Sequence, residues 1–169
     1  MLRDLYDWVL HWAETPYGSW ALGALAFSES SFFPIPPDAL LIALALSVPA
    51  KAFWYAFICS GSSVVGGMLG YLIGLFLMQV VGNRILSLYG ATDKFQWVKR
   101  YYERYDAWAV GVAGFTPIPY KIFTIAAGAC RINFKVFLLA SAISRSARFF
   151  LVAALIYQFG EPIKIFIDR

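Results

Sequence analysis

Two proline-rich strings interrupt the apolar stretches of this chain, and they restrict its fold more than any other feature. The first string is Pro34-Ile35-Pro36-Pro37-Asp38, and the second is Thr116-Pro117-Ile118-Pro119-Tyr120. Proline lacks an N–H group, fixes φ and moves the preceding residue out of helical geometry. Each string therefore ends any helix that enters it and splits its apolar stretch into two short segments.

The composition requires lipid as the main solvent of the folded chain. Of its 169 residues, 60% are hydrophobic and 14% are charged, whereas soluble domains average about 45–50% apolar and about 25% charged residues. The Lys and Arg residues are scattered, which fits anionic lipid headgroups better than nucleic acid, so we expect no nucleic-acid partner. We predict an all-α integral membrane protein with a single membrane domain over residues 1–169.

The apolar segments fall into two length classes. A membrane-spanning helix needs about 20 apolar residues. Segments 53–80 and 134–159 exceed that length, whereas the segments flanking each proline string are shorter. We predict that each short pair forms a re-entrant hairpin, whose broken backbone is tolerated where it is buried in protein or lines a wet cavity. The predicted hairpin tips are Pro34, Pro36, Pro37, Pro117 and Pro119.

The two halves of the chain resemble each other in sequence. The string F-x-P-I-P occurs at residues 32–36 and again 83 positions later, at 115–119. A hairpin plus one spanning helix crosses the membrane an odd number of times, so the second copy would be inverted, as in many transporters. Four simple spanning helices are the alternative. Five further residues recur at an offset of 84, which pairs Lys51, Phe53, Ala56, Ser60 and Ser62 with Lys135, Phe137, Ala140, Ser144 and Ser146.

This inverted repeat divides the chain into five predicted segments. Residues 1–15 form an interfacial amphipathic helix, 16–80 the first repeat, 81–106 an amphipathic connector, 107–160 the second repeat and 161–169 a tail. Within the first repeat, small residues recur at every fourth position, which predicts a close helix-packing seam. The seam consists of Ser62, Gly66, Gly70 and Gly74.

Five charged residues fall deep inside the predicted membrane segments, away from their ends. Glu29 and Asp38 belong to the first hairpin, Lys121 follows the second tip at the position matching Asp38, and Arg145 and Arg148 share one face of the last span. A central charge costs about 2.5–3.5 kcal/mol on insertion scales. We expect these groups to face one another around a hydrated cavity. The alternative is a set of static ion pairs, although desolvation can exceed the Coulombic gain of such pairs.

The second tip also predicts an anion site. A half-helix that begins near Tyr120 directs its N-terminal N–H groups and positive dipole end at the cavity, beside Lys121, and this combination suits phosphate. No enzyme is predicted, because the chain lacks H-E-x-x-H and C-x-x-C motifs and a membrane histidine that would activate Ser62 or Ser63. We expect no metal or cofactor.

Three strings together resemble the DedA family, also called SNARE-associated or VTT-domain membrane proteins, and most of all its YqaA branch. They are residues 29–38 (ESSFFPIPPD), 66–74 (GGMLGYLIG) and 114–121 (GFTPIPYK), followed by Ala127-Gly128. The likeness covers about residues 17–160. It implies a bacterial inner-membrane, multi-pass protein with two opposed re-entrant hairpins, from a family linked to moving phospholipids or polyprenyl phosphate between leaflets with proton coupling.

The resemblance also implies roles for individual residues. Glu29 and Asp38 match the acidic residues of the family's first hairpin, and Lys121 matches a basic residue after the second tip. Many members carry an arginine before that tip, where this chain has Gly114-Phe115-Thr116. Arg145 or Arg148 would supply the missing charge.

We therefore predict a transporter of a phosphate-bearing lipid. Lys121, Arg145 and Arg148 would bind the phosphate, and Glu29 and Asp38 would carry protons or gate the site. The alternatives are a proton-coupled carrier of a small soluble solute and a membrane scaffold that transports nothing. The sequence leaves open the lipid, the driving ion, the orientation, whether a homo-oligomer forms, and whether the activity is that of a flippase or a scramblase.

Overall fold

The computed structural model describes residues 15–31, 37–88, 92–115 and 120–167, which form helices and no strand. Most of the predicted interfacial helix at 1–15 lies outside these residues, as do Pro34, Pro36, Pro117 and Pro119. The elements are α2 (Tyr17–Ser31), α3 (Asp38–Ser47), η1 (Pro49–Lys51), α4 (Ala52–Leu77), η2 (Met78–Gly82), α5 (Asn83–Leu88), α6 (Thr92–Phe115), α7 (Tyr120–Ala129) and α8 (Phe134–Ile167).

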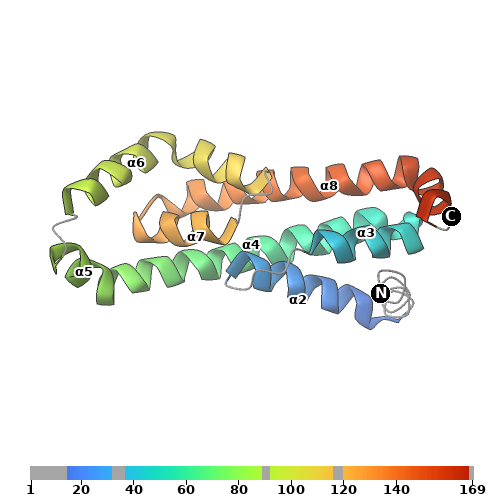
Figure 1. Cartoon of the computed structure of the whole chain (residues 1–169), viewed down its shortest axis with the longest axis horizontal. Coiled ribbons are helices and arrows are strands. Elements are labelled where there is room, and N and C mark those ends of the chain that lie inside the picture. Colours follow the sequence, from blue (N-terminus) through green and yellow to red (C-terminus); the bar gives the residue numbers. More distant parts are fainter. Residues whose placement is uncertain (1–14, 32–36, 89–91, 116–119, 168–169) are drawn as a thin grey trace.

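Two long helices form the spine of the molecule. The helical run Pro49–Gly82, centred on α4, and the segment Phe134–Gly160 of α8 are long and apolar enough to cross a membrane. They pack against each other along their length (Figure 1). Both runs coincide with the segments that the sequence predicts to span.

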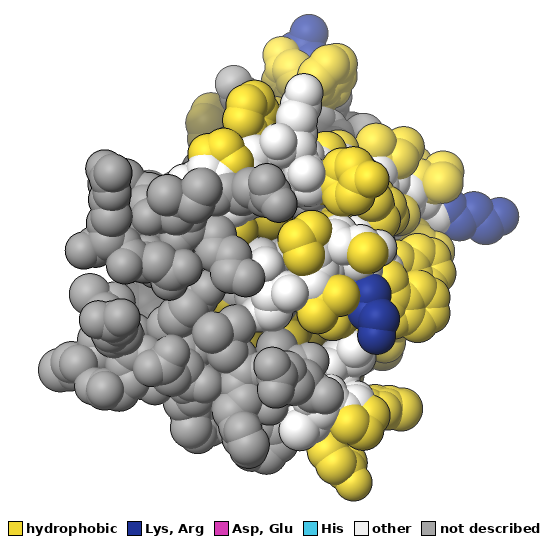
Figure 2. All heavy atoms as spheres, turned by 90° about the vertical axis from the view of Figure 1, so that its right-hand side faces the viewer, with side chains coloured by type: hydrophobic (Ala, Val, Ile, Leu, Met, Phe, Trp, Pro, Cys, Tyr) yellow, Lys and Arg dark blue, Asp and Glu magenta, His cyan; other side chains and the backbone are white. Residues whose placement is uncertain are grey.

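The surface of the described residues is largely apolar. Trp20 is 81% exposed, Trp108 76% and Ile143 69%. Viewed from one end, hydrophobic side chains cover much of the described surface, with a few Lys and Arg side chains projecting (Figure 2). Water-soluble monomers rarely expose apolar area on this scale, so these side chains are suited to contact with lipid tails.

The short helices cover opposite halves of the spine. α2 and α3 run along one half in opposite directions, whereas α7 and the second part of α6 lie on the other half (Figure 1). α2 packs on α4 and α3 on α8, while α7 packs on α4 and α6 on α8. Each pair of short helices therefore contacts both long helices.

Glycines of α4 allow α2 and α7 to approach closely. A Cβ atom at Gly66 would collide with the carbonyl of Phe27 in α2, and one at Gly74 would collide with the carbonyl of Ile125 in α7. Gly70 faces Thr124 of α7. The small-residue seam predicted from the sequence thus lies where α4 contacts both short helices, which is the arrangement that small residues permit in membranes.

Two helix boundaries differ from the sequence prediction. α8 continues through Pro162 to Ile167, although a tail was expected to begin at Glu161. A proline removes one backbone hydrogen bond and bends a helix, but it need not end it. α6 extends across the predicted boundary between the connector and the second repeat. It kinks at Tyr105, where φ is −125° and ψ is 20°.

The seam provides a test of this packing. Gly74→Ala should lower the unfolding temperature in detergent, because the added Cβ forces α7 away from α4 at a cost of about 1–3 kcal/mol. The matched control is Gly61→Ala on the same helix, where a Cβ meets nothing within 4 Å. The control should unfold at or above the parent's temperature, since alanine favours helix more than glycine does. Equal unfolding temperatures for both variants would contradict the seam.

Candidate functional site

A layer of buried polar side chains separates two apolar cores. Along α8, Phe137 belongs to one core, Ser141, Ser144 and Arg145 follow, and Phe149 belongs to the other core. α4 shows the same succession in reverse, with Cys59 in the second core, then buried serines, then Tyr71 in the first. The buried polar residues among those described are Ser30, Ser31, Ser60, Ser63, Thr124, Ser141, Ser144 and Arg145.

Arg145 is the centre of this layer. Its side chain is 1% exposed and forms an ion pair with Glu29 of α2, with 2.6 Å between Nη2 and Oε2. Its Nε donates a hydrogen bond to Ser63 Oγ of α4 over 2.5 Å. Ser63 Oγ lies 2.6 Å from Ser30 Oγ, which itself donates to Glu29. The guanidinium therefore joins α8 to α2 and α4 through charge-assisted hydrogen bonds.

Aromatic rings flank the same guanidinium. Its Cζ atom lies 4.7 Å from the ring centroid of Tyr120, the first residue of α7, and 4.8 Å from that of Phe149. Cation–π attraction is strongest where water is excluded, at about 2 kcal/mol or more. Arg145 thus contacts all of α2, α4 and α7 from its place on α8.

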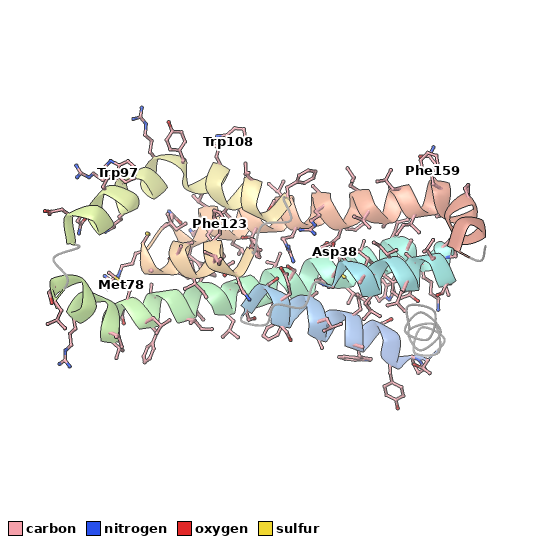
Figure 3. The ribbon with its side chains drawn as sticks, in the orientation of Figure 1. Asp38, Met78, Trp97, Trp108, Phe123 and Phe159 are labelled. Carbon is pink, nitrogen blue, oxygen red and sulfur yellow. The ribbon has the colours of Figure 1, made fainter. Side chains whose placement is uncertain are left out.

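A second ion pair lies one helical turn away. Arg148 Nη2 is 2.7 Å from Asp38 Oδ2, and the two side chains are 19% and 25% exposed. Asp38 is the first residue of α3, where its negative charge interacts favourably with the positive end of the helix dipole. It lies between α3 and α8 near the middle of the long axis (Figure 3). Both arginines lie close to residue 147, the midpoint of the Phe134–Gly160 segment.

Lys121 has a different environment from the arginines. It is the second residue of α7 and is half-buried, and its carbonyl accepts a hydrogen bond from Thr124. Asp38, which the repeat placed in the corresponding position, pairs with Arg148. Within the described part of the chain, no ion pair of the Lys121 ammonium is seen. The structure therefore brings together four of the five predicted charges as two pairs.

Sequence reasoning missed four neighbours of these charges. Ser30 and Ser63 provide hydroxyls to the Glu29–Arg145 pair, and Tyr120 and Phe149 provide the flanking rings. Serines inside an apolar span are a recognisable signal for interhelical hydrogen bonds. The two rings carry no such signal, because aromatic residues are abundant throughout this chain.

The Tyr120 hydroxyl provides a test of the layer. It is buried, and among the described residues it has no hydrogen-bond partner. Tyr120→Phe should keep or raise the unfolding temperature, because it removes a buried polar group that costs about 1–3 kcal/mol when unpaired. Tyr120→Leu should lower it, since the ring over Arg145 is lost. Circular dichroism during heating in detergent distinguishes them, and a large loss in Tyr120→Phe would show that the hydroxyl is engaged.

Known proteins are similar to this chain over nearly its whole length. The family model of the VTT domain matches residues 12–158. An uncharacterized protein of Haemophilus influenzae is 38% identical over 157 residues, which cover 93% of this chain and 81% of that protein. A second, from Histophilus somni, is 39% identical over 157 residues, covering 93% and 82%.

A more distant relative is an uncharacterized protein of Methanocaldococcus jannaschii. It is 24% identical over 133 residues, which cover 78% of this chain and 79% of that protein. No solved structure matches the chain.

Proposed function

This chain belongs to the VTT-domain family of membrane proteins, the DedA family, and we propose that it moves a phosphate-bearing lipid between membrane leaflets. The substrate is a phospholipid or a polyprenyl phosphate, and transport is coupled to protons or sensitive to pH. The protein would reside in the bacterial inner membrane and cross it several times.

One observation carries this proposal: a partly exposed arginine–carboxylate pair lies at the middle of an apolar span. Arg148 and Asp38 are within 2.7 Å, yet both side chains remain partly accessible. Charged groups at such a depth are rare in membrane proteins and are a sign of a substrate or ion pathway. A guanidinium recognises phosphate oxygens with several N–H donors, so a phosphate can replace the carboxylate as its partner.

The proposed architecture places that pair at the junction of two broken helices. We propose that α2 with α3, and the end of α6 with α7, are re-entrant hairpins related by an inverted repeat. Their support is the shared F-x-P-I-P string and the way each pair covers one half of the spine (Figure 1). Inverted repeats of broken helices form midplane binding sites in transporters.

The charges of the site favour an anionic substrate. Three cations and two carboxylates lie deep in the predicted membrane segments, away from Lys135 at the end of the last span, which leaves one positive charge in excess among them. Lys121 holds that excess at the start of α7, where the helix dipole adds further positive potential. Glu29 and Asp38, which pair with Arg145 and Arg148, would carry the coupled protons or gate the site.

Leaflet exchange in liposomes is the direct test. Purified protein reconstituted with a trace of fluorescent phospholipid, or of a labelled polyprenyl phosphate, should expose the label to an external reductant faster than protein-free liposomes do. The reason is that a polar path past the arginines lowers the barrier for the phosphate to cross the apolar core. Should neither lipid exchange while a small soluble solute is carried, a solute carrier would be the correct function.

The role of Asp38 predicts that its carboxylate is needed for rapid transport. The carboxylate pairs with Arg148, and we expect it to take the arginine back from the phosphate after each transfer. Asp38→Asn should exchange lipid slowly, because the neutral amide cannot reclaim Arg148 from the phosphate. Exchange rates measured in liposomes check this, with Asp93→Asn, an exposed carboxylate at the start of α6, as the control. An Asp38→Asn protein with the parent's rate would make the carboxylate structural.

A further inference from the structure

Helix α6 has two parts that differ in composition. Seven of the fifteen residues at 92–106, which we call the polar part of α6, are charged, and residues 107–115 carry no charge. The helix kinks at Tyr105, at the border between the two parts. Beyond the kink α6 runs along α8, whereas the polar part lies at the same end of the molecule as α5 (Figure 1). The kink therefore separates a part suited to lipid tails from a part suited to headgroups and water.

The length of the first long helical run indicates the level of the polar part. The run Pro49–Gly82 contains 34 residues, which span about 50 Å at about 1.5 Å per residue. The hydrocarbon core of a bilayer is only about 30 Å thick. Lys51 is an exposed cation near the start of the run, so the excess length falls at the opposite end. That end leads into α5, and it brings α5 and the polar part of α6 to the level of the headgroups (Figure 1).

One exposed face of α6 combines tryptophan with arginine. Trp97, Arg100 and Arg104 follow at spacings of three and four residues, which places them on one side of the helix. Trp108 follows one turn beyond Arg104, past the kink, and all four side chains are exposed. Trp97 and Trp108 mark the two ends of this set, which we call the α6 face (Figure 3). The Arg104 guanidinium also lies 5.9 Å from the ring centroid of Tyr105.

Both residue types of the α6 face suit the surface of an anionic bilayer. Tryptophan is enriched at the level of the headgroups, and arginines near a membrane surface are attracted to anionic lipids. The face continues along α6 into Val112 and Phe115, which are exposed apolar side chains suited to lipid tails. A partner from the water phase would have to bind within the headgroup region, so the bilayer itself is the favoured occupant.

We propose that the α6 face binds anionic lipid headgroups, with Arg100 and Arg104 contacting the headgroup phosphates and the two tryptophans lying at the boundary with the lipid tails. This binding holds the polar part of α6 on the membrane surface. The α6 face is separate from the two arginine–carboxylate pairs, and the proposal goes beyond the proposed transport function.

Nanodiscs of chosen lipid composition test this surface. Gln96 is exposed next to the α6 face, and Gln96→Cys can be labelled selectively with the fluorophore NBD, because Cys59 and Cys130 are both buried. The quencher is phosphatidylcholine with a nitroxide on its headgroup, in discs of phosphatidylcholine with or without phosphatidylglycerol. Quenching should be stronger with phosphatidylglycerol, and high salt should weaken it because salt screens the attraction between exposed charges.

Variants of the labelled protein separate the arginines from net charge. Each arginine lost should lower the ratio of bound to unbound α6 about fivefold, so Arg100→Gln with Arg104→Gln should be quenched equally in both kinds of disc. The control is Lys51→Gln with Lys135→Gln, which removes the same charge from exposed positions outside α6 and should keep the response to phosphatidylglycerol. Arg148→Gln should also keep it, which distinguishes this surface from the proposed transport site.

Three results would overturn the inference. The first is a label that phosphatidylglycerol does not affect in the parent, as expected if α6 is solvated or binds a soluble protein. The second is an equal loss of the response in the two double variants, which would show that net charge alone is responsible. The third is strong quenching that persists without phosphatidylglycerol and without the two arginines, which would show anchoring by the aromatic rings alone. Lipid exchange in liposomes is measured separately, so none of these results decides the transport function.

Discussion

The burial of one guanidinium governs the rest of this structure. Arg145 lies near the middle of an apolar span with 1% of its side chain exposed, where an unpaired charge would cost several kcal/mol. That cost is offset only if a carboxylate, hydroxyl groups and aromatic rings converge on the same point. They come from α2, α4, α7 and α8, so the position of one side chain constrains the packing of four helices.

The small residues of α4 make this convergence geometrically possible. Gly66 and Gly70 lie against α2 and α7, and a Cβ atom at Gly67 would lie 3.1 Å from the Tyr120 hydroxyl. Larger side chains at these positions would separate the short helices from the spine. Glu29, Ser30 and Tyr120 would then lie too far from Arg145 to bond with it. The close helix packing at the glycines and the bonds of Arg145 therefore depend on each other. Lipid tails are as apolar as the helix surfaces, so apolar contact alone does not hold the helices together.

The same arrangement leaves the two ion pairs in different surroundings. Arg145 is 1% exposed and bonds to side chains of α2 and α4, so it holds those helices against α8. Arg148 and Asp38 remain 19% and 25% exposed. Solvent screens an exposed ion pair more than an enclosed one, so the loss of Arg145's carboxylate would cost more stability than the loss of Arg148's.

The sequence by itself determined the class of protein. Hydrophobic content, segment lengths and proline positions act locally, so they can be read along the chain without knowing which residues contact each other. It placed the two long helices and the ends of α3 and α7. It did not determine which charges pair, because Glu29 and Arg145 are separated by 116 residues and Asp38 and Arg148 by 110. The repeat suggested that Asp38 corresponds to Lys121, yet correspondence within a repeat does not imply contact. Only the rotation and approach of the helices, set by glycine contacts far along the chain, decided that Ser63 and Tyr120 meet Arg145 and that Arg148 meets Asp38.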